Sequence, residues 1–298
     1  MQELRKPAGV PSDCSRIMFS MNRLSTEKRA AILGMMVEGN SLRATTRLTG
    51  CSINTVSKLL TDIGDACTAF QDRTLVDLPC KTLQCDEIWS FVYSKQKNVP
   101  ADRQGEFGVG DVWTWTAIDA DSKLVPSWFV GQRTAEDGFL FTMDLKGRLA
   151  NRVQMTTDGL RAYSAAIGFS FGTELDWAVL QKLYGRDPSG ERRYSPAVCT
   201  GMDISVKRGN PDPAKISTSY VERQNLTMRM SMRRFTRLTN GFSKKVDNHM
   251  AAVALHFMHY NFARPHTSLK NPYPRTPAMA AGVADHVWGL REIAALLD

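Results

Sequence analysis

The eleven residues Thr82–Val92 read TLQCDEIWSFV, an apolar, β-rich run that is interrupted by Asp86 and Glu87. Such a run predicts a strand in the middle of a sheet. A buried, ionised carboxylate is costly unless a cation or a donor compensates it, so Asp86 is expected to be either salt-bridged or bound to a metal ion. Side chains alternate along a strand, which places Glu87 on the opposite face from Asp86 and argues against both acids binding one ion.

The segments after this strand predict two more strands in a hairpin and then alternating helices and strands. The predicted elements are a hairpin in Asp111–Gly131 (DVWTWTAIDADSKLVPSWFVG), a helix over 135–149, a strand in Arg152–Gly159 (RVQMTTDG), a helix over 160–167 and a short strand near 177–183. Hairpins give antiparallel pairs, and a helical crossover gives a parallel pair. The order therefore predicts an α/β fold with a mixed sheet flanked by helices.

Two further acids lie at the ends of predicted elements. Asp158 ends a strand and precedes Gly159, and Glu222 lies in the first turn of a helical pattern in Ser217–Arg234 (STSYVERQNLTMRMSMRR). Each has a structural alternative, since Asp158 suits a turn and Glu222 follows Ser219 at capping-box spacing.

Taken together, three carboxylates that are distant in sequence suit two hard cations that clamp the attacking and leaving oxygens of a phosphoryl transfer. We therefore predict that Asp86, Asp158 and Glu222 are metal ligands. Helical spacing places Glu222, Asn225, Arg229 and Arg233 on one face, where arginines would grip phosphate oxygens. Asp119 and Asp121 lie at the hairpin tip, where a role in the turn is favoured.

Residues 22–66 predict three short helices in the order of a helix-turn-helix domain. Ser25, Ser41 and Ser52 are the expected caps, and Gly39 and Gly50 end the first two helices. The last helix would enter the DNA major groove. The predicted DNA contacts are Ser52, Asn54, Thr55, Ser57 and Lys58, with Arg43 and Arg47 from the preceding helix. The alternative is a small helical bundle used for packing or dimerisation.

The composition favours a polyanionic partner. The chain has 298 residues, 43% of them hydrophobic, and a net charge of +8. Ten basic residues and only two acidic ones lie between Ser205 and Lys245, so this segment carries a charge equal to that of the whole chain. The six cysteines include no CxxC pair, so neither disulfides nor zinc is expected. Without a signal sequence or an apolar run of about 18 residues, we expect a cytoplasmic protein with no membrane partner.

These patterns predict five segments. They are an irregular N-terminal segment (1–21), the helix-turn-helix domain (22–66), a linker (67–80), a catalytic domain (81–270) with a loop insertion (185–216), and a C-terminal tail with a short helix (271–298).

The motifs CDEIWSFV, WTWTAIDADSKLV, TDG at Asp158 and YVERQN with a downstream arginine resemble the transposases of the insertion sequence 1 group, members of the DDE superfamily. The resemblance spans about residues 22–270. It implies an RNase-H-like core, with two Mg²⁺ (or Mn²⁺) ions held by Asp86, Asp158 and Glu222, and it matches Arg229 to a basic residue seven positions after the glutamate. Many members carry a zinc finger of paired cysteines, whereas Cys14 here stands alone.

The later segment YNFARPHTSL (Tyr260–Leu269), followed by Thr276-Pro277-Ala278, is similar to a tail shared by many DDE transposases and integrases. Its Asn261, Arg264 and His266 either approach the cleft or serve only helix termination and packing.

The resemblance implies a transposase that binds element ends in double-stranded DNA, hydrolyses a phosphodiester and joins the 3′-OH to target DNA. Because two ends must be joined, we expect a homodimer or larger assembly, acting on the nucleoid of a bacterium. Two alternatives remain open: a DNA-binding regulator without catalytic activity, and a metal-dependent nuclease that cuts but does not join.

Overall fold

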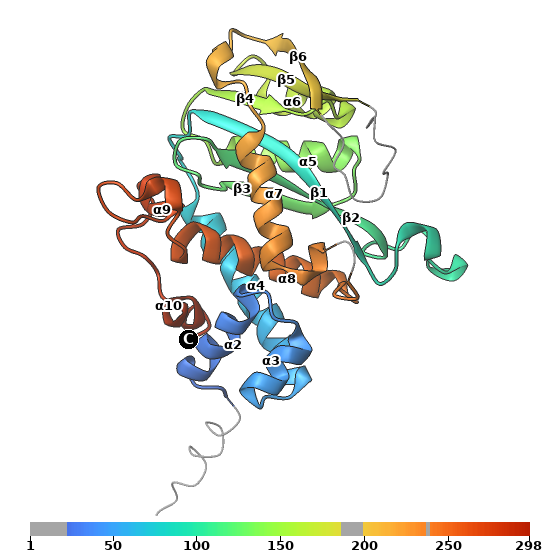
Figure 1. The fold of residues 1–298 in the computed structure, drawn as a ribbon, viewed down its shortest axis with the longest axis vertical. Coiled ribbons are helices and arrows are strands. Elements are labelled where there is room, and N and C mark those ends of the chain that lie inside the picture. Colours follow the sequence, from blue (N-terminus) through green and yellow to red (C-terminus); the bar gives the residue numbers. More distant parts are fainter. Residues whose placement is uncertain (1–22, 186–198, 237–238) are drawn as a thin grey trace, which may run out of the picture.

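A six-stranded mixed sheet forms the centre of the molecule (Figure 1). The computed structural model describes residues 23–185, 199–236 and 239–298. The strand order is β3-β2-β1-β4-β5-β6. The strands are β1 (Thr82–Val92), β2 (Gly110–Asp119), β3 (Ser127–Gly131), β4 (Val153–Thr157), β5 (Leu175–Tyr184) and β6 (Cys199–Arg208).

The pairing confirms the predicted mixed sheet. The pairs β1–β2 and β2–β3 are antiparallel, whereas β1–β4 and β4–β5 are parallel. The helix α5 (Ala135–Gly147) leads from β3 to β4, and α6 (Arg161–Phe171) connects the parallel strands β4 and β5. The prediction of a loop over 185–216 is wrong for β6, which pairs antiparallel with β5. Most β6 side chains are exposed, so this strand lacks the buried apolar pattern that identifies a strand in sequence.

Helices cover both faces of the sheet (Figure 1). On one face Trp115 of β2 packs against Phe141 of α5 and Tyr163 of α6. On the other face lies α7 (Ser219–Ser231), which buries Val221 and Met228.

Below the sheet in Figure 1, α8 (Val246–Met258) passes into a π-helical turn (His259–Ala263) and packs against α4. Short 3-10 turns complete the chain at Gln96–Asn98, Ala101–Arg103, Pro213–Lys215, Arg233–Phe235 and Thr267–Leu269.

Three N-terminal helices form as predicted: α2 (Thr26–Val37), α3 (Leu42–Thr49) and α4 (Ile53–Thr74). The caps are the three expected serines, whose hydroxyls each accept a hydrogen bond from the backbone three residues on. The third helix was expected to end near residue 66, yet it continues to Thr74 through much of the predicted linker. Cys67 and Gln71 are buried, and Gln71 donates to the Ala254 carbonyl of α8, so packing extends the helix.

The C-terminal segment contains α9 (Pro277–Ala280) and α10 (Leu290–Ala295), which fits the predicted short helix. The α10 helix packs on α2, where the buried Arg29 donates to the Ala294 carbonyl at 3.0 Å and pairs with Asp298. One hydrophobic cluster continues from α2 through the sheet to α10. The N-terminal segment predicted to be irregular (1–21) lies outside the described residues. The division of the chain into domains stays a prediction. No helix in the described part of the chain is long and apolar enough to cross a bilayer.

Candidate metal centre

The acids of β1 and β4 meet because the two strands are parallel. The last residue pair of the β1–β4 ladder joins Cys85 to Thr157. Asp86 is therefore the first β1 residue without a β4 neighbour, and Asp158 is the first residue after β4. Oxygen atoms of Asp86, Glu87 and Asp158 lie within 4.8 Å of one another. The structure thus brings together two of the three predicted ligands and adds Glu87.

The Asp86 carboxylate is held from two sides. Its Oδ1 accepts a hydrogen bond from the Glu87 backbone at 2.8 Å, and its Oδ2 accepts one from the Asn225 side chain of α7, also at 2.8 Å. Burial, together with the charges of Asp158 and Glu222, raises the pKa of Asp86 to about 6, although both hydrogen bonds act to lower it. A cation would relieve this repulsion.

Glu87 is the acid that the sequence reasoning excluded. Its side chain lies on the face of Trp115, as alternation requires, but the carboxylate still reaches the space left by the end of β4. Arg133 contacts it at 3.1 Å and stacks over the Trp113 ring. Burial, followed by the charges of Asp158 and Asp86, raises the pKa of Glu87 to about 8. The Tyr163 hydroxyl and Arg133 both act to lower this pKa but offset only part of the shift. Two adjacent acids in one buried strand were the available sequence signal.

Asp158 forms the predicted turn and also lies beside the acids of β1. Its Oδ1 accepts a hydrogen bond from the Leu160 backbone at 2.9 Å, which forms the turn into α6. Its Oδ2 lies 3.8 Å from Arg133, and the side chain is about one-third exposed at 35%. The turn therefore uses Oδ1, whereas Oδ2 lies on the side of Arg133, which also contacts Glu87.

Glu222 lies near this cluster but does not join its 4.8 Å group. Lys182 of β5 contacts both carboxylate oxygens, at 2.6 and 2.5 Å, and the Thr218 hydroxyl donates at 2.8 Å. The capping-box alternative does not apply, because the N-cap of α7 is Thr218 and not Ser219. Sequence reasoning gave no role to Lys182, which lies forty residues before its partner.

Of the four residues predicted to share one face of α7, the helix contains Glu222, Asn225 and Arg229 but not Arg233. Asn225 is buried and binds Asp86, whereas it was predicted to contact DNA. Arg229 lies in the last turn of the helix. The helix ends at Ser231, and Met232 is extended, so Arg233 begins a separate 3-10 turn and does not continue the face.

The predicted DNA contacts of α3 and α4 lie away from the acids. Ser57 accepts a hydrogen bond from Asn248 of α8, and Lys58 pairs with Asp62. Arg43 lines a cavity of about 660 Å³ between the N-terminal helices and α8. Ser52, Asn54 and Arg47 are exposed, and Thr55 is half-buried.

Of the three tail residues, only Asn261 has a packing role that the contacts show. Asn261 is buried, accepts from the Val125 backbone N–H at 3.0 Å and donates to its carbonyl at 2.9 Å. The ring of His266 accepts from Ser268, and Arg264 is exposed. Asp119 accepts from the Thr82 and Ser122 backbones, as expected of an acid in a turn.

The donors of the cluster fit a hard divalent cation. They are all carboxylate oxygens, which Mg²⁺ and Mn²⁺ prefer over sulfur or imidazole ligands. Glu87 Oε1 is buried without a hydrogen-bond partner among the described residues. An ion bound here would compensate that oxygen and the crowded charges together.

This crowding predicts that the metal-free protein loses stability as the pH rises. Both carboxyl pKa values lie above their ordinary ranges, so the folded chain holds these protons more tightly than the unfolded chain does. The contribution of these two carboxyl groups to the free energy of unfolding is fully present below about pH 4. It is lost as the pH rises through about 6 for Asp86 and about 8 for Glu87, a loss on the order of a few kcal/mol. Urea unfolding in EDTA between pH 5 and 8 measures it.

In the same experiment Glu87→Gln should reduce the fall in the free energy of unfolding between about pH 7 and 8. Added Mg²⁺ should restore the stability of the wild type most at pH 8. The exposed Asp102→Asn is the matched control and should follow the wild type. An unchanged slope in Glu87→Gln would contradict the assignment of the pH dependence to this cluster.

Comparison with known proteins gives structural neighbours only. No protein-family model matches the chain, and no curated protein matches it. The piggyBac transposase synaptic complex with hairpin DNA matches with 10% identity and a TM-score of 0.34, over 95% of this chain and 74% of that chain. The Mos1 mariner paired-end complex with Mn matches with 13% identity and a TM-score of 0.28, over 85% and 78%.

A pre-cleavage Mos1 transpososome matches with 12% identity and a TM-score of 0.21, over 58% of this chain and 61% of that chain. This chain therefore spans less than two-thirds of that neighbour. At these identities and TM-scores the likeness establishes neither a family nor an activity, so function must be argued from the chain's own residues.

Proposed function

We propose that this protein is a DDE-type DNA transposase of an insertion sequence, similar to the insertion sequence 1 group, with an RNase-H-like catalytic core. The observation that carries the proposal is the meeting of Asp86 and Asp158 where β4 ends beside its parallel neighbour β1, with Asn225 of α7 bound to Asp86 and Glu222 of α7 near it. Three antiparallel strands followed by two parallel ones support the RNase-H-like assignment.

In this proposal Asp86 and Asp158 would hold Mg²⁺ or Mn²⁺, with Glu222 as the third ligand. Glu87 lies next to these acids, within 4.8 Å of Asp86 and Asp158. Two bound ions would activate the attacking oxygen and stabilise the leaving oxygen of a phosphodiester. Asn225 orients the Asp86 carboxylate, and Lys182 holds Glu222 in the metal-free protein. Glu222 would hold an ion only by giving up its ion pair with Lys182, and the freed ammonium group could then bind a phosphate oxygen.

The remaining residues would bind double-stranded DNA. The exposed residues of α3 and α4 would read the element ends, and the basic stretch of 205–245 would contact the backbone. We further propose that the chain works as a homodimer, or a larger assembly, on the bacterial nucleoid, since two ends must be brought together. Zinc is not part of the proposal.

The test is cutting and joining of labelled element-end DNA with a target plasmid, in Mg²⁺ or in EDTA. Glu222→Gln should lose both reactions, on the order of a thousandfold, because one ligand and its charge are removed. Glu174→Gln, an exposed acid paired with Lys146, is the matched control and should stay active.

Cutting without joining in the wild type would favour the nuclease alternative. Tight end binding with no cleavage under any metal would favour the DNA-binding regulator.

A further inference from the structure

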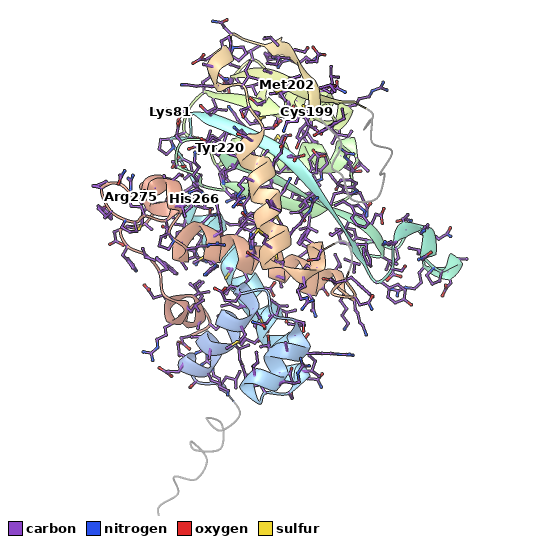
Figure 2. All side chains as sticks on the ribbon, viewed as in Figure 1. Lys81, Cys199, Met202, Tyr220, His266 and Arg275 are labelled. Atoms are coloured by element: carbon purple, nitrogen blue, oxygen red, sulfur yellow. The ribbon has the colours of Figure 1, made fainter. Side chains whose placement is uncertain are left out.

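The edge strand β6 exposes a row of apolar side chains. Met202, Ile204 and Val206 are 63%, 49% and 56% exposed. They lie opposite Lys182, Leu180 and Ala178 of β5, on the sheet face where Lys182 reaches Glu222. Figure 2 shows Cys199 and Met202 on this strand, at the end of the molecule farthest from α2 and α3.

The backbone of this strand is also available for pairing. Among the residues that the structure describes, β6 pairs with β5 alone and ends the sheet. Its ladder is regular from Gly201 to Val206 and is interrupted by a register shift at each end. A straight edge strand with an apolar face is a template for pairing with another strand.

We propose that β6 is a homodimer surface, on which the β6 strands of two copies pair antiparallel about a two-fold axis at Ile204. In this register Ile204 lies opposite Ile204 of the partner subunit, and Met202 lies opposite Val206 of the partner subunit. On the other face Asp203 lies opposite Ser205 of the partner subunit, whose hydroxyl can donate to the carboxylate. Every pair is complementary, as a two-fold interface requires.

The neighbouring registers are poorer. A two-fold axis at Asp203 sets that carboxylate against its own copy. An axis at Ser205 sets Met202 against Arg208 and runs through the irregularity at Lys207. A shift by one residue moves the apolar row to the opposite face from its copy. The uninterrupted part of β6 therefore matches itself best around Ile204.

A second copy fits this surface better than nucleic acid does, because the exposed row is apolar and holds no cation. Pairing would join two six-stranded sheets into one and place both acid clusters on it. This inference rests on the proposed function, in which the transposase acts as a dimer. It identifies β6 as the surface through which the two copies would associate.

The first test measures mass in solution by sedimentation, with neither DNA nor metal present. The wild type should have the mass of two chains. Ile204→Lys should weaken the dimer at least about a hundredfold, because two ammonium groups would meet on the axis. Phe169→Lys replaces an 81% exposed aromatic side chain on α6 and is the matched control, which should stay dimeric.

The second test fixes the register and does not depend on a charged variant. In a parent carrying serine at 14, 51 and 199, Ile204→Cys should form a disulfide-linked dimer on mild oxidation. Ser205→Cys should not, since its two copies would be diagonal and beyond disulfide reach.

A monomeric wild type, an Ile204→Lys variant that stays dimeric, or cross-linking at 205 in place of 204 would overturn the proposal. Sedimentation and cross-linking do not depend on catalysis. A dimer that shows no transposition would therefore contradict only the proposed function. If the wild type transposes but the Ile204→Lys variant still forms the dimer, only the proposed β6 surface is contradicted.

Discussion

Asp86→Asn should abolish metal-dependent cleavage and strand transfer while leaving binding to element ends intact. Asp86 is the candidate ligand whose carboxylate contacts α7, through Asn225, so the proposal gives it a part in positioning the helix as well as in binding an ion. Loss of one anionic ligand removes several kcal/mol of transition-state stabilisation, or about a thousandfold or more in rate. Single-turnover joining with labelled ends, beside a gel-shift assay for end binding, measures both quantities.

The same variant should fold at least as well as the wild type in EDTA. The substitution removes a carboxylate whose burial and neighbours raise its pKa to about 6. Asn225 has a buried Oδ1 without a partner among the described residues, so its amide can turn to accept from the new side chain. Asp121→Asn, at the hairpin tip, is the activity control. Metal-dependent joining that persists in Asp86→Asn would show that this acid is not a ligand.

Gly64→Ala should be among the most destabilising single-methyl changes available in this chain. A Cβ at position 64 would lie 2.4 Å from the Ala251 Cβ and 2.5 Å from its Cα, where α4 crosses α8. Backbone cannot move aside as a flexible side chain can, so the two helices must separate along a crossing that buries Ile63 and Cys67. We expect a loss of about 3 kcal/mol in the free energy of unfolding, the upper range for overpacking.

Gly168→Ala is the matched control for this change. Gly168 also lies in a helix, α6, and a Cβ there would meet nothing within 4 Å. It should stabilise the protein by roughly 0.5–1 kcal/mol, because alanine has the higher helix propensity. Urea unfolding of both variants gives the comparison. Similar stabilities for the two would mean that α4 and α8 do not cross as closely as described.

Five of the six strands, β1 to β5, could be predicted because their signals are local. The hairpin after β1, the helices that return the chain to β4 and β5, and the serine caps of α2, α3 and α4 each depend on residues a few positions apart. The same reasoning placed Asp86 inside one strand and Asp158 at the end of another, and parallel pairing of the two strands brought them together. Their role as metal ligands stays a prediction, as does that of Glu222.

Contacts between distant segments decided the rest. Glu87 joins the acid cluster because β4 stops at Thr157, which strand alternation in β1 cannot reveal. Glu222 finds Lys182 on another strand, and Asn225 binds Asp86 where a surface role was predicted.

The sequence by itself therefore determined the order of the elements, the pairing of the central strands and the positions of the acids along the chain. Only the tertiary structure decided which acids meet, how far α4 extends along α8, that α10 packs on α2, and that β6 forms an edge strand. The physical reason is that periodicity and capping act within a turn or a strand, whereas these features depend on packing between residues that are tens to hundreds of positions apart.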